Sequence, residues 1–382
     1  MDELNMKLKP LLIAVLLLTF LHTGTVHAYQ METLAKQAII VDDSTGTVLF
    51  EKNADELMHP SSMSKLMTMM MVFEKLKSGA LKMTDTFPVS EKAWSTQGSK
   101  MFVELGNQIP LEELIKGVII QSGNDACIVL AEGLAGSEES FAAQMNAKAK
   151  EIGLTNSNFV NSTGWSDEKH LTTARDLSKI ARYIIHEFPD FYHFYSQTEF
   201  TYHGIKQQNR NPLLGKNLGV DGLKTGHTDA AGYGVTISGV SPDNRRIIMV
   251  INGLSSMNER AEEAEKLITH AYRDFENVTV FKKGEVIDSA DVWLGVKDAV
   301  PLTVSEDVLV TLPKARTGKL KSKLVYEGPI AAPIESGKQV AQAVIDLGDG
   351  NSMTVPLITA ESVEKKGFFG RIIPNLKQLL GL

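Results

Sequence analysis

Hydrophobic and polar positions follow two different periods along this chain, and each change of period predicts a change of structure. Apolar segments on either side of a polar turn at 42–46 predict a β-hairpin over 38–51, and alternating stretches predict strands at 234–240 and 246–253. A short strand is predicted at 223–226, after an Asp-Gly turn. Apolar residues at helical spacing predict helices over 66–76, 111–121, 125–134, 137–152, 176–186 and 258–275. Segments 88–106 and 156–173 are polar and predicted to be irregular.

Strands stand at both ends of this region, with the helices between them. We therefore predict an α/β domain over residues 29–275, in which one sheet brings the first hairpin beside the last strands. From residue 278 onward, apolar residues alternate with period two, interrupted by Gly and Pro and with no helical pattern. This pattern predicts a small all-β domain over 276–362, which serves as a spacer or a protein-contact platform.

The first 28 residues have the pattern of a secretory signal peptide. An apolar run at 11–21 follows Lys7 and Lys9, and Ala28 ends a small-residue cleavage site. The run is too short to span a bilayer comfortably. The acidic residues at positions 2 and 3 are unusual in front of such a run, so the initiator is Met1 or Met6. We expect an exported protein that acts outside the cytoplasm, where ATP-dependent chemistry is not expected.

The last segment, 363–382, is predicted to form a basic amphipathic helix. Its large apolar residues lie within an arc of about 140° at helical spacing, with three cationic residues on the other side: Lys366, Arg371 and Lys377. Pro374 is expected to kink the helix. A helix of this kind binds at a membrane surface without spanning it. The alternative is a helix docked on the chain's own β domain.

Composition and charge narrow the function classes. The chain has 382 residues, 43% of them hydrophobic and 22% charged, which suits a globular protein of more than one domain. Its net charge of −7 does not indicate nucleic-acid binding, for which a basic surface is expected. The single cysteine, Cys127, cannot form an intramolecular disulfide, and we interpret it as a packing residue. Because no Cys/His spacing typical of zinc occurs, we expect neither a metal nor a cofactor.

The strongest chemical candidate is a hydroxyl and an amine one turn apart, Ser62 and Lys65, at the start of a predicted buried helix. Burial lowers the pKa of a lysine, so a neutral Lys65 amine can accept the serine proton. By itself the spacing is weak, because Ser-x-x-Lys occurs three times in the chain, also at Ser166 and Ser362. An isolated pair of this kind is usually a solvated pair near a helix cap.

Two later triplets, at 122–124 and 224–226, supply polar groups that the Ser62–Lys65 pair lacks. Ser122 lies at a helix junction where its hydroxyl can relay a proton, and the Asn124 amide can donate to a substrate carbonyl and accept from Lys65. On a predicted edge strand, Lys224 and Thr225 offer a cation and a hydroxyl to a carboxylate. Gly226 is expected to let a substrate backbone lie close. Taken singly, the triplets are also explained as a junction turn and a strand end.

The three motifs in this order resemble the signature set of penicillin-binding proteins and serine β-lactamases. The surrounding residues 60–68, 121–127, 208–211 and 220–229 are similar to those of the low-molecular-mass D-alanyl-D-alanine carboxypeptidases. The β domain and the amphipathic tail resemble that family as well, so the likeness covers essentially the whole mature chain. It implies a serine acyl-transfer enzyme that removes the terminal D-alanine from peptidoglycan pentapeptides and is acylated by β-lactams.

The resemblance also implies roles for single residues. Ser62 is the nucleophile, Lys65 its base and Ser122 the proton relay. The backbone N–H groups of Ser62 and His227 form the oxyanion hole, and such donors are worth ~3–4 kcal/mol each. Lys224 and Thr225 hold the terminal carboxylate together with Arg210, although an alternative for Arg210 is a structural pair with an acid such as Asp221. The implied location is the outer, periplasmic face of the cytoplasmic membrane, in cell-wall biogenesis.

Two rival functions remain. In class A β-lactamases the deacylation base is a glutamate followed by x-x-Leu-Asn, and the nearest segment here, starting at Glu168, lacks the Asn. Gly123 also stands where those enzymes carry Asp, so both departures favour the carboxypeptidase. The second rival is a non-catalytic penicillin sensor or peptidoglycan-binding module. A sensor needs a transmembrane segment, and a binding module has no need of Lys65 with both hydroxyls.

Overall fold

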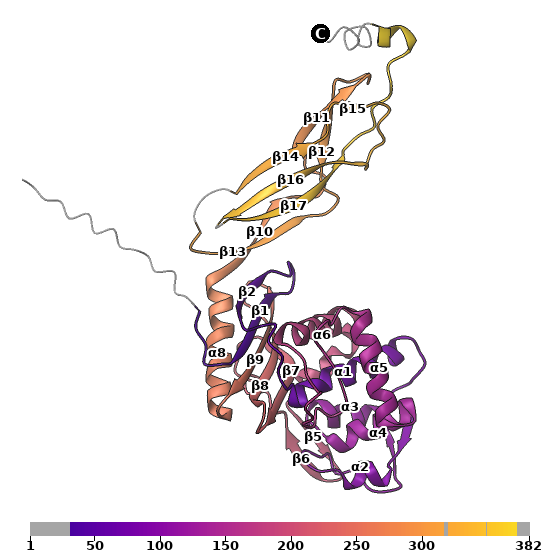
Figure 1. Cartoon of the computed structure of the whole chain (residues 1–382), viewed down its shortest axis with the longest axis vertical. Coiled ribbons are helices and arrows are strands. Elements are labelled where there is room, and N and C mark those ends of the chain that lie inside the picture. Colours follow the sequence, from indigo (N-terminus) through magenta and orange to yellow (C-terminus); the bar gives the residue numbers. More distant parts are fainter. Residues whose placement is uncertain (1–30, 317–319, 349, 373–382) are drawn as a thin grey trace, which may run out of the picture. The chain divides into compact units, whose positions relative to one another are not determined.

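The computed structural model describes residues 31–316, 320–348 and 350–372. The predicted signal peptide and the last ten residues of the predicted tail helix lie outside this range. The first domain is built on a five-stranded antiparallel sheet in the order β2-β1-β9-β8-β7 (Figure 1). Its strands are β1 Gln37–Asp42, β2 Val48–Lys52, β7 Val220–Thr228, β8 Gly232–Val240 and β9 Arg246–Leu254. The first hairpin therefore pairs directly with the last strand of the domain, as predicted from the sequence.

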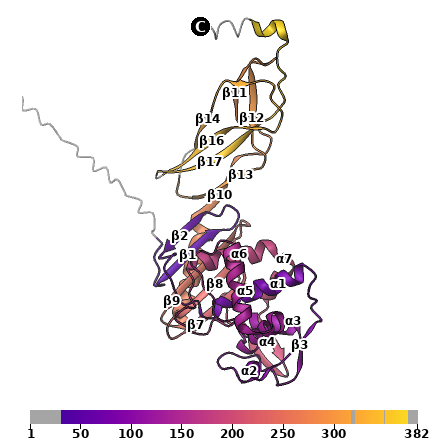
Figure 2. The same ribbon diagram turned by 45° about the vertical axis from the view of Figure 1, so that its right-hand side comes forward.

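Both faces of this sheet are covered, which explains why β1 is buried along its whole length. Alternate residues of a strand point to opposite faces, and here they enter two different cores. Ile39 and Val41 pack into the core on the helical side, whereas Ala38 and Ile40 pack into the core beneath α8, Met257–Asp274. Figure 1 shows α8 on one face of the sheet and the other helices on the opposite face, and in Figure 2 the helices α1, α3 and α4 lie to the right of strands β7, β8 and β9.

The helical side holds the elements that carry the predicted motifs. Its helices are α1 Lys65–Lys77, α2 Glu91–Ser95, α3 Leu111–Ile119, α4 Asn124–Ala135, α5 Glu138–Glu151, α6 Ala174–Glu187 and α7 Pro189–Tyr192. Two 3-10 turns, η1 Ser61–Ser64 and η2 His193–Ser196, and two small hairpins accompany them. The hairpins are β3 Thr86–Pro88 with β4 Gln108–Pro110, and β5 Glu199–Tyr202 with β6 Ile205–Gln208. Helix α1 is buried from Lys65 to Phe73 and runs through this core.

The predicted helices and strands of this domain are confirmed to within a few residues, whereas one local prediction is wrong and several short elements were not predicted. Residues 88–106 are not wholly irregular, because α2 forms there. Its start is capped by the Ser90 hydroxyl, which accepts from the Ala93 N–H, and Ala93 is buried. A helix of five residues is too short to show a period. The β5–β6 hairpin was not predicted, because its strands are only four residues long and mostly exposed.

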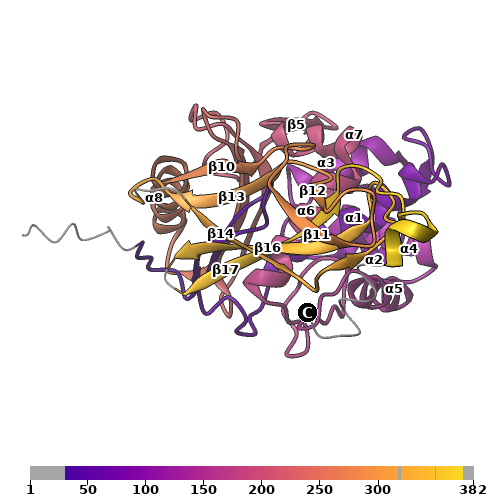
Figure 3. The same ribbon diagram turned by 90° about the horizontal axis from the view of Figure 1, so that it is seen from above.

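The second domain is all-β. Strands β10 Phe275–Phe281 and β13 Val308–Pro313 pair with each other. A six-stranded sheet has the order β14-β16-β17-β12-β11-β15. Figure 3 shows its strands β14, β16, β17, β12 and β11 from above, and Figure 1 labels β15 as well. Its members are β11 Asp288–Trp293, β12 Ala299–Thr303, β14 Lys321–Tyr326, β15 Ile330–Ala331, β16 Gln339–Gly348 and β17 Asn351–Thr359. The period-two pattern buries one face of these strands, with Leu302, Ile345 and Leu357 in the core.

Residues 363–366 were assigned to the predicted tail helix, but they belong to the β domain. Val363 is buried in the β-domain core and exchanges backbone hydrogen bonds with Ile334, and the Lys366 N–H donates to Leu294. Residues 368–372 are helical, and Phe368, Phe369 and Ile372 are exposed. Within the described residues, no helix is long and apolar enough to cross a membrane.

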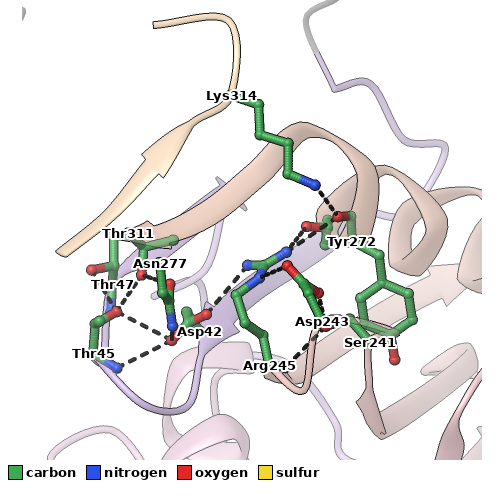
Figure 4. Close-up of polar contacts among 11 residues, drawn as sticks. Asp42, Thr45, Thr47, Ser241, Asp243, Arg245, Tyr272, Asn277, Thr311 and Lys314 are labelled. Atoms are coloured by element: carbon green, nitrogen blue, oxygen red, sulfur yellow. Dashed lines mark hydrogen bonds and ion pairs between the residues drawn. The ribbon is translucent and has the colours of Figure 1, made fainter. Parts of the chain in front are cut away.

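Polar residues connect the β1–β2 turn with strands β10 and β13 of the β domain (Figure 4). The Asp42 carboxylate accepts from the Thr45 N–H and the Asn277 amide, and pairs with the Arg245 guanidinium at 3.4 Å. Arg245 also donates to the carbonyls of Ala271 and Tyr272 at the end of α8. The hydroxyls of Thr45 and Thr311 lie 2.5 Å apart. Because Asp42 and Arg245 are almost completely buried, this ion pair is protected from solvent screening.

Candidate active site

Lys65 is the first residue of α1 and lies in the centre of a hydrogen-bonded cluster. Its ammonium donates to Ser62 Oγ at 3.0 Å, to Asn124 Oδ1 at 2.8 Å and to the Thr163 carbonyl at 2.6 Å. The i, i+3 spacing thus brings hydroxyl and amine together even though Ser62 lies in the 3-10 turn η1 and not in the α-helix. Burial lowers the pKa of Lys65 to about 8, and the Arg210 charge acts in the same direction. A substantial fraction of the amine is therefore neutral near pH 8.

Glycines allow the chain to approach η1 from two sides. A Cβ on Gly226 would lie 2.1 Å from Ser61 Oγ and 2.9 Å from the Pro60 carbonyl. A Cβ on Gly164 would lie 1.9 Å from the Ser61 carbonyl. The structure thus gives a reason for Gly226 besides the predicted close approach of a substrate backbone. This glycine lets strand β7 pack against the turn that carries Ser62.

Ser122 and Lys224 form a second pair next to the first. Lys224 lies on β7, the edge strand of the sheet, and its ammonium donates to Ser122 Oγ at 3.0 Å. Burial lowers the pKa of Lys224 well below its usual range, and the charges of Lys65 and Arg210 lower it further. Ser122 has a φ of +60°. A non-glycine residue in this backbone conformation destabilises the folded state by about 1–3 kcal/mol. The surrounding fold therefore keeps the Ser122 hydroxyl in a position that an unstrained backbone would not give it.

Asn124 joins the Lys65 cluster to the preceding loop. Its Oδ1 accepts from Lys65, as expected from the sequence, whereas its Nδ2 donates to the Gln97 carbonyl at 2.8 Å. Its backbone N–H donates to the Ser99 carbonyl at 2.7 Å. One of the two N–H groups of the Asn124 amide therefore bonds within the protein, and the other remains for the predicted contact with a substrate carbonyl.

A cleft of about 440 Å³ opens over the two serines. It is lined by Ser62, Ser99, Ser122, Arg210, Thr225, Gly226, His227, Tyr233, Met257 and Arg260. Lys65, Asn124 and Lys224 are not among these residues, because they are buried behind the serines. The Lys224 ammonium is thus placed to act through Ser122, while Thr225 and His227 line the cleft directly.

Two arginines give the cleft its positive charge. Arg210 donates to Ser99 Oγ at 2.6 Å. The alternative that it pairs with Asp221 is wrong, because Asp221 forms a two-point ion pair with Arg246 and accepts from the Tyr192 hydroxyl. In the described part of the chain, Arg210 has no carboxylate within ion-pair distance.

Arg260, on α8, was not predicted from the sequence. Its side chain lines the cleft and lies over the Tyr233 ring, and its buried Nε has no hydrogen-bond partner among the described residues. Burial lowers the pKa of Arg260 to about 10. A buried N–H donor without a partner in a cleft is suited to an anionic ligand. Nothing in the sequence marked Arg260, because arginines are common on the polar face of an amphipathic helix.

The remaining candidates have simpler surroundings. Cys127 is fully buried in the helical core, and burial raises the pKa of its thiol to about 12, so the group stays protonated and packs as an apolar side chain. His227 is stacked on Tyr233 with ring centroids 3.9 Å apart at the cleft. In the portion of the chain that the structure describes, no cluster of three or more His, Cys, Asp or Glu residues could hold a metal ion.

Comparison with known proteins gives a class for this fold and site. Residues 24–255 match the family described as D-alanyl-D-alanine carboxypeptidase, and residues 275–365 match the C-terminal domain of penicillin-binding protein 5. The chain is 41% identical to the D-alanyl-D-alanine carboxypeptidase DacC of Escherichia coli K12, over 88% of this chain and 86% of that protein. It is 34% identical to DacF of Bacillus subtilis 168, over 98% of this chain and 97% of that protein. The chain belongs to the D-alanyl-D-alanine carboxypeptidase family and is a serine-type peptidase.

Solved structures agree with this assignment. Penicillin-binding protein 5 of Haemophilus influenzae superimposes with a TM-score of 0.80 at 33% identity, over 88% of this chain and 99% of that one. Penicillin-binding protein D2 of Listeria monocytogenes, in its cefotaxime-bound form, aligns with 64% of this chain and 99% of its own, at 27% identity and a TM-score of 0.59. The fold class predicted from the sequence is confirmed, and the carboxypeptidase function is supported over the two rival functions.

Proposed function

We propose that the cleft removes the terminal D-alanine of a peptidoglycan pentapeptide through an acyl-enzyme at Ser62. The observation that carries this proposal is the hydrogen bond from the Lys65 ammonium to Ser62 Oγ in a cluster where burial lowers the lysine pKa to about 8. Neutral Lys65 takes the Ser62 proton as Oγ attacks the carbonyl carbon of the penultimate D-alanine. The tetrahedral oxyanion is expected to accept from the backbone N–H groups of Ser62 and His227.

Collapse of this intermediate breaks the peptide bond, and the leaving amine needs a proton. Ser122 lines the cleft and accepts a hydrogen bond from Lys224, which orients its hydroxyl toward the reacting groups. We assign Ser122 as the donor to the leaving amine, resupplied from the lysines behind it. Water then attacks the acyl-enzyme and releases the shortened peptide. The Asn124 amide, fixed by Lys65 and Gln97, is the candidate contact for the acyl chain.

The part of the cleft lined by Arg210 and Arg260 is suited to bind the carboxylate of the terminal D-alanine. Thr225 lines the cleft as well. The Arg260 Nε has no hydrogen-bond partner among the described residues, which is the strongest reason to add Arg260 to the residues predicted to hold the carboxylate. Lys224 is buried and bonded to Ser122, so its part in holding the carboxylate is electrostatic.

β-Lactams are the expected inhibitors. The Listeria monocytogenes relative was solved in cefotaxime-bound and ampicillin-bound forms. The test is to mix the protein with a fluorescent penicillin and to measure D-alanine release from a pentapeptide in parallel. We expect labelling and release in the wild type and neither in Ser62→Ala. Undiminished labelling of Ser62→Ala would refute the assignment of the nucleophile.

The cellular location of the protein is proposed from its N-terminal and C-terminal segments. We infer export through the signal peptide at 1–28 and peripheral attachment to the outer face of the cytoplasmic membrane through the tail. Because Val363 and Lys366 belong to the β domain, we place the start of the anchor after Gly367 rather than at 363. The exposed Phe368, Phe369 and Ile372 support an interfacial role.

A further inference from the structure

A second pocket, of about 460 Å³, lies next to the catalytic cleft and shares none of its lining residues. It is lined by Lys92, Ser95, Thr96, Gln97, Ile128, Glu138, Asn161, Thr163 and Trp165. These residues come from α2 and the chain after it, from α4 and α5, and from the irregular segment before α6. Its volume is within the range of roughly 300–1,000 Å³ that is usual for small-ligand sites.

The two cavities are separated by the catalytic cluster itself. The Lys65 ammonium bonds to Ser62 Oγ, which lines the cleft, and to the carbonyl of Thr163, which lines the second pocket. The Asn124 amide donates to the carbonyl of Gln97, also in the second pocket. A ligand in the second pocket therefore lies one layer of side chains away from the acylated serine.

Trp165 forms the aromatic wall of this pocket. A Cβ on Gly98 would lie 2.8 Å from both the Asn124 amide nitrogen and Trp165 Cζ3, so this glycine lets the indole approach the Asn124 side chain. Even so, 53% of Trp165 is exposed. A large aromatic ring that is held in place and left open to solvent is a typical contact surface for a ligand.

The charged residues of the pocket are already paired. One oxygen of the buried Glu138 carboxylate accepts from the N–H and hydroxyl of Ser162, and the other pairs with the Lys92 ammonium at 3.0 Å. An ion entering the pocket would have to compete with these bonds. Hydroxyls of Ser95 and Thr96 and the amide of Gln97 add uncharged polar groups. The lining therefore favours a neutral ligand with many hydroxyl or amide groups and one flat apolar face.

We propose that the second pocket binds an N-acetylated sugar of the glycan strand that carries the scissile peptide. The C–H face of a pyranose ring stacks on the Trp165 indole, and its hydroxyl and acetamido groups bond to the polar wall. This inference rests on the proposed function, which places a glycan-linked peptide in the neighbouring cleft. It gives the enzyme a second contact with polymeric substrate that a free peptide lacks.

The experiment uses the full-length protein after acylation with penicillin, so that the catalytic cleft is blocked. A tetramer of β-1,4-linked N-acetylglucosamine is titrated while Trp fluorescence and saturation-transfer NMR are recorded. We expect saturable binding in the acylated wild type and about tenfold weaker binding in Trp165→Ala, as expected for the loss of one aromatic contact. Trp165→Phe keeps an aromatic face and should bind nearly as well as the wild type.

Trp94→Ala is the matched control, because Trp94 lies on the adjacent α2, is 48% exposed and does not line the pocket. If Trp165→Ala does not fold, Ser95→Arg tests the same prediction by filling the pocket from an exposed position. Absence of saccharide binding, equal loss in Trp94→Ala, or preference for the bare pentapeptide would overturn the proposal. Failure of penicillin to acylate Ser62 would instead count against the proposed function, and the titration of the unmodified protein would still test the pocket.

Discussion

At the scale of single residues, the site depends on two lysines that have lost most of their contact with water. Burial lowers the pKa of both Lys65 and Lys224, and the charge of Lys65 lowers the pKa of Lys224 further. Charged ammonium groups in such surroundings are destabilised relative to neutral amines, which makes one of them available as a base near neutral pH. The uncharged acceptors around Lys65, Ser62, Asn124 and the Thr163 carbonyl, orient the amine without restoring its pKa.

The pH profile of acylation tests the state of Lys65. Because burial lowers its pKa to about 8, the neutral, reactive fraction is small below that pH and nearly complete well above it. We expect the acylation rate by a fluorescent penicillin to rise about tenfold per pH unit on the acid side and to level off above the pKa. Lys65→Arg should remain unacylated at every pH. A flat profile from pH 6 to 9 would contradict Lys65 as the base.

Arg260 is predicted to bind the terminal carboxylate. In Arg260→Ala, kcat/KM for a peptide with a free terminal carboxylate should fall about 10–100-fold, the usual effect of losing a hydrogen bond to a charged group. The same peptide capped as an amide should be cleaved equally slowly by both proteins. Arg316→Ala, in the β domain, is the control. Equal losses on both peptides would show that Arg260 supports the fold and does not bind the carboxylate.

At the scale of elements, strand β7 and turn η1 must touch for the motifs to meet. The contact is possible because Gly226 has no side chain where the strand crosses the turn. Helix α4 starts beside them and brings Asn124 to Lys65, while α8 supplies Arg260 from the opposite side of the sheet. The site residues therefore come from several elements, and small shifts between these elements change the distances between the reacting groups.

Gly226→Ala tests this contact. A Cβ at this position would lie 2.1 Å from Ser61 Oγ, so β7 or η1 has to move. A displacement of about 1 Å can cost about 100-fold in rate, and we expect a loss of that order in acylation with the domain still folded by circular dichroism. Gly367→Ala is the control, because no atom of the described residues lies within 4 Å of a Cβ there. Wild-type acylation by Gly226→Ala would show that the contact can relax.

At the scale of the whole molecule, a buried ion pair supports the polar contacts between the β1–β2 turn and the β domain. Asp42 and Arg245 hold together the turn, the end of α8 and the start of β10. Removal of one partner from a buried pair leaves an uncompensated charge, which typically costs about 3–5 kcal/mol. We expect Arg245→Met to lose stability by about that amount in urea unfolding. The double variant Asp42→Leu/Arg245→Met should recover part of it, and a loss below about 1 kcal/mol would contradict this role.

Membrane attachment is predicted to be separable from catalysis. A chain ending at Gly367 keeps Val363 and Lys366 in the β domain and removes the exposed phenylalanines. It should cleave small peptides at the wild-type rate and should no longer co-sediment with anionic vesicles. Phe368→Ser/Phe369→Ser in the full-length chain should weaken vesicle binding without truncation. Full loss of peptide cleavage in the truncated protein would show that the tail is part of the fold.

The sequence by itself determined the periods of hydrophobic positions, and with them the element order, the α/β fold followed by a β domain, and the three motifs. The Ser62–Lys65 contact was also determined locally, because residues three apart on a helical turn are neighbours. Only the tertiary structure decided which residues from distant elements meet. Lys224 bonds to Ser122, and Arg260 lines the cleft. Arg246 forms the ion pair with Asp221. The tertiary structure also placed Val363 in a core and gave Gly226 a packing role. These outcomes depend on long-range packing, for which spacing along one chain carries no signal.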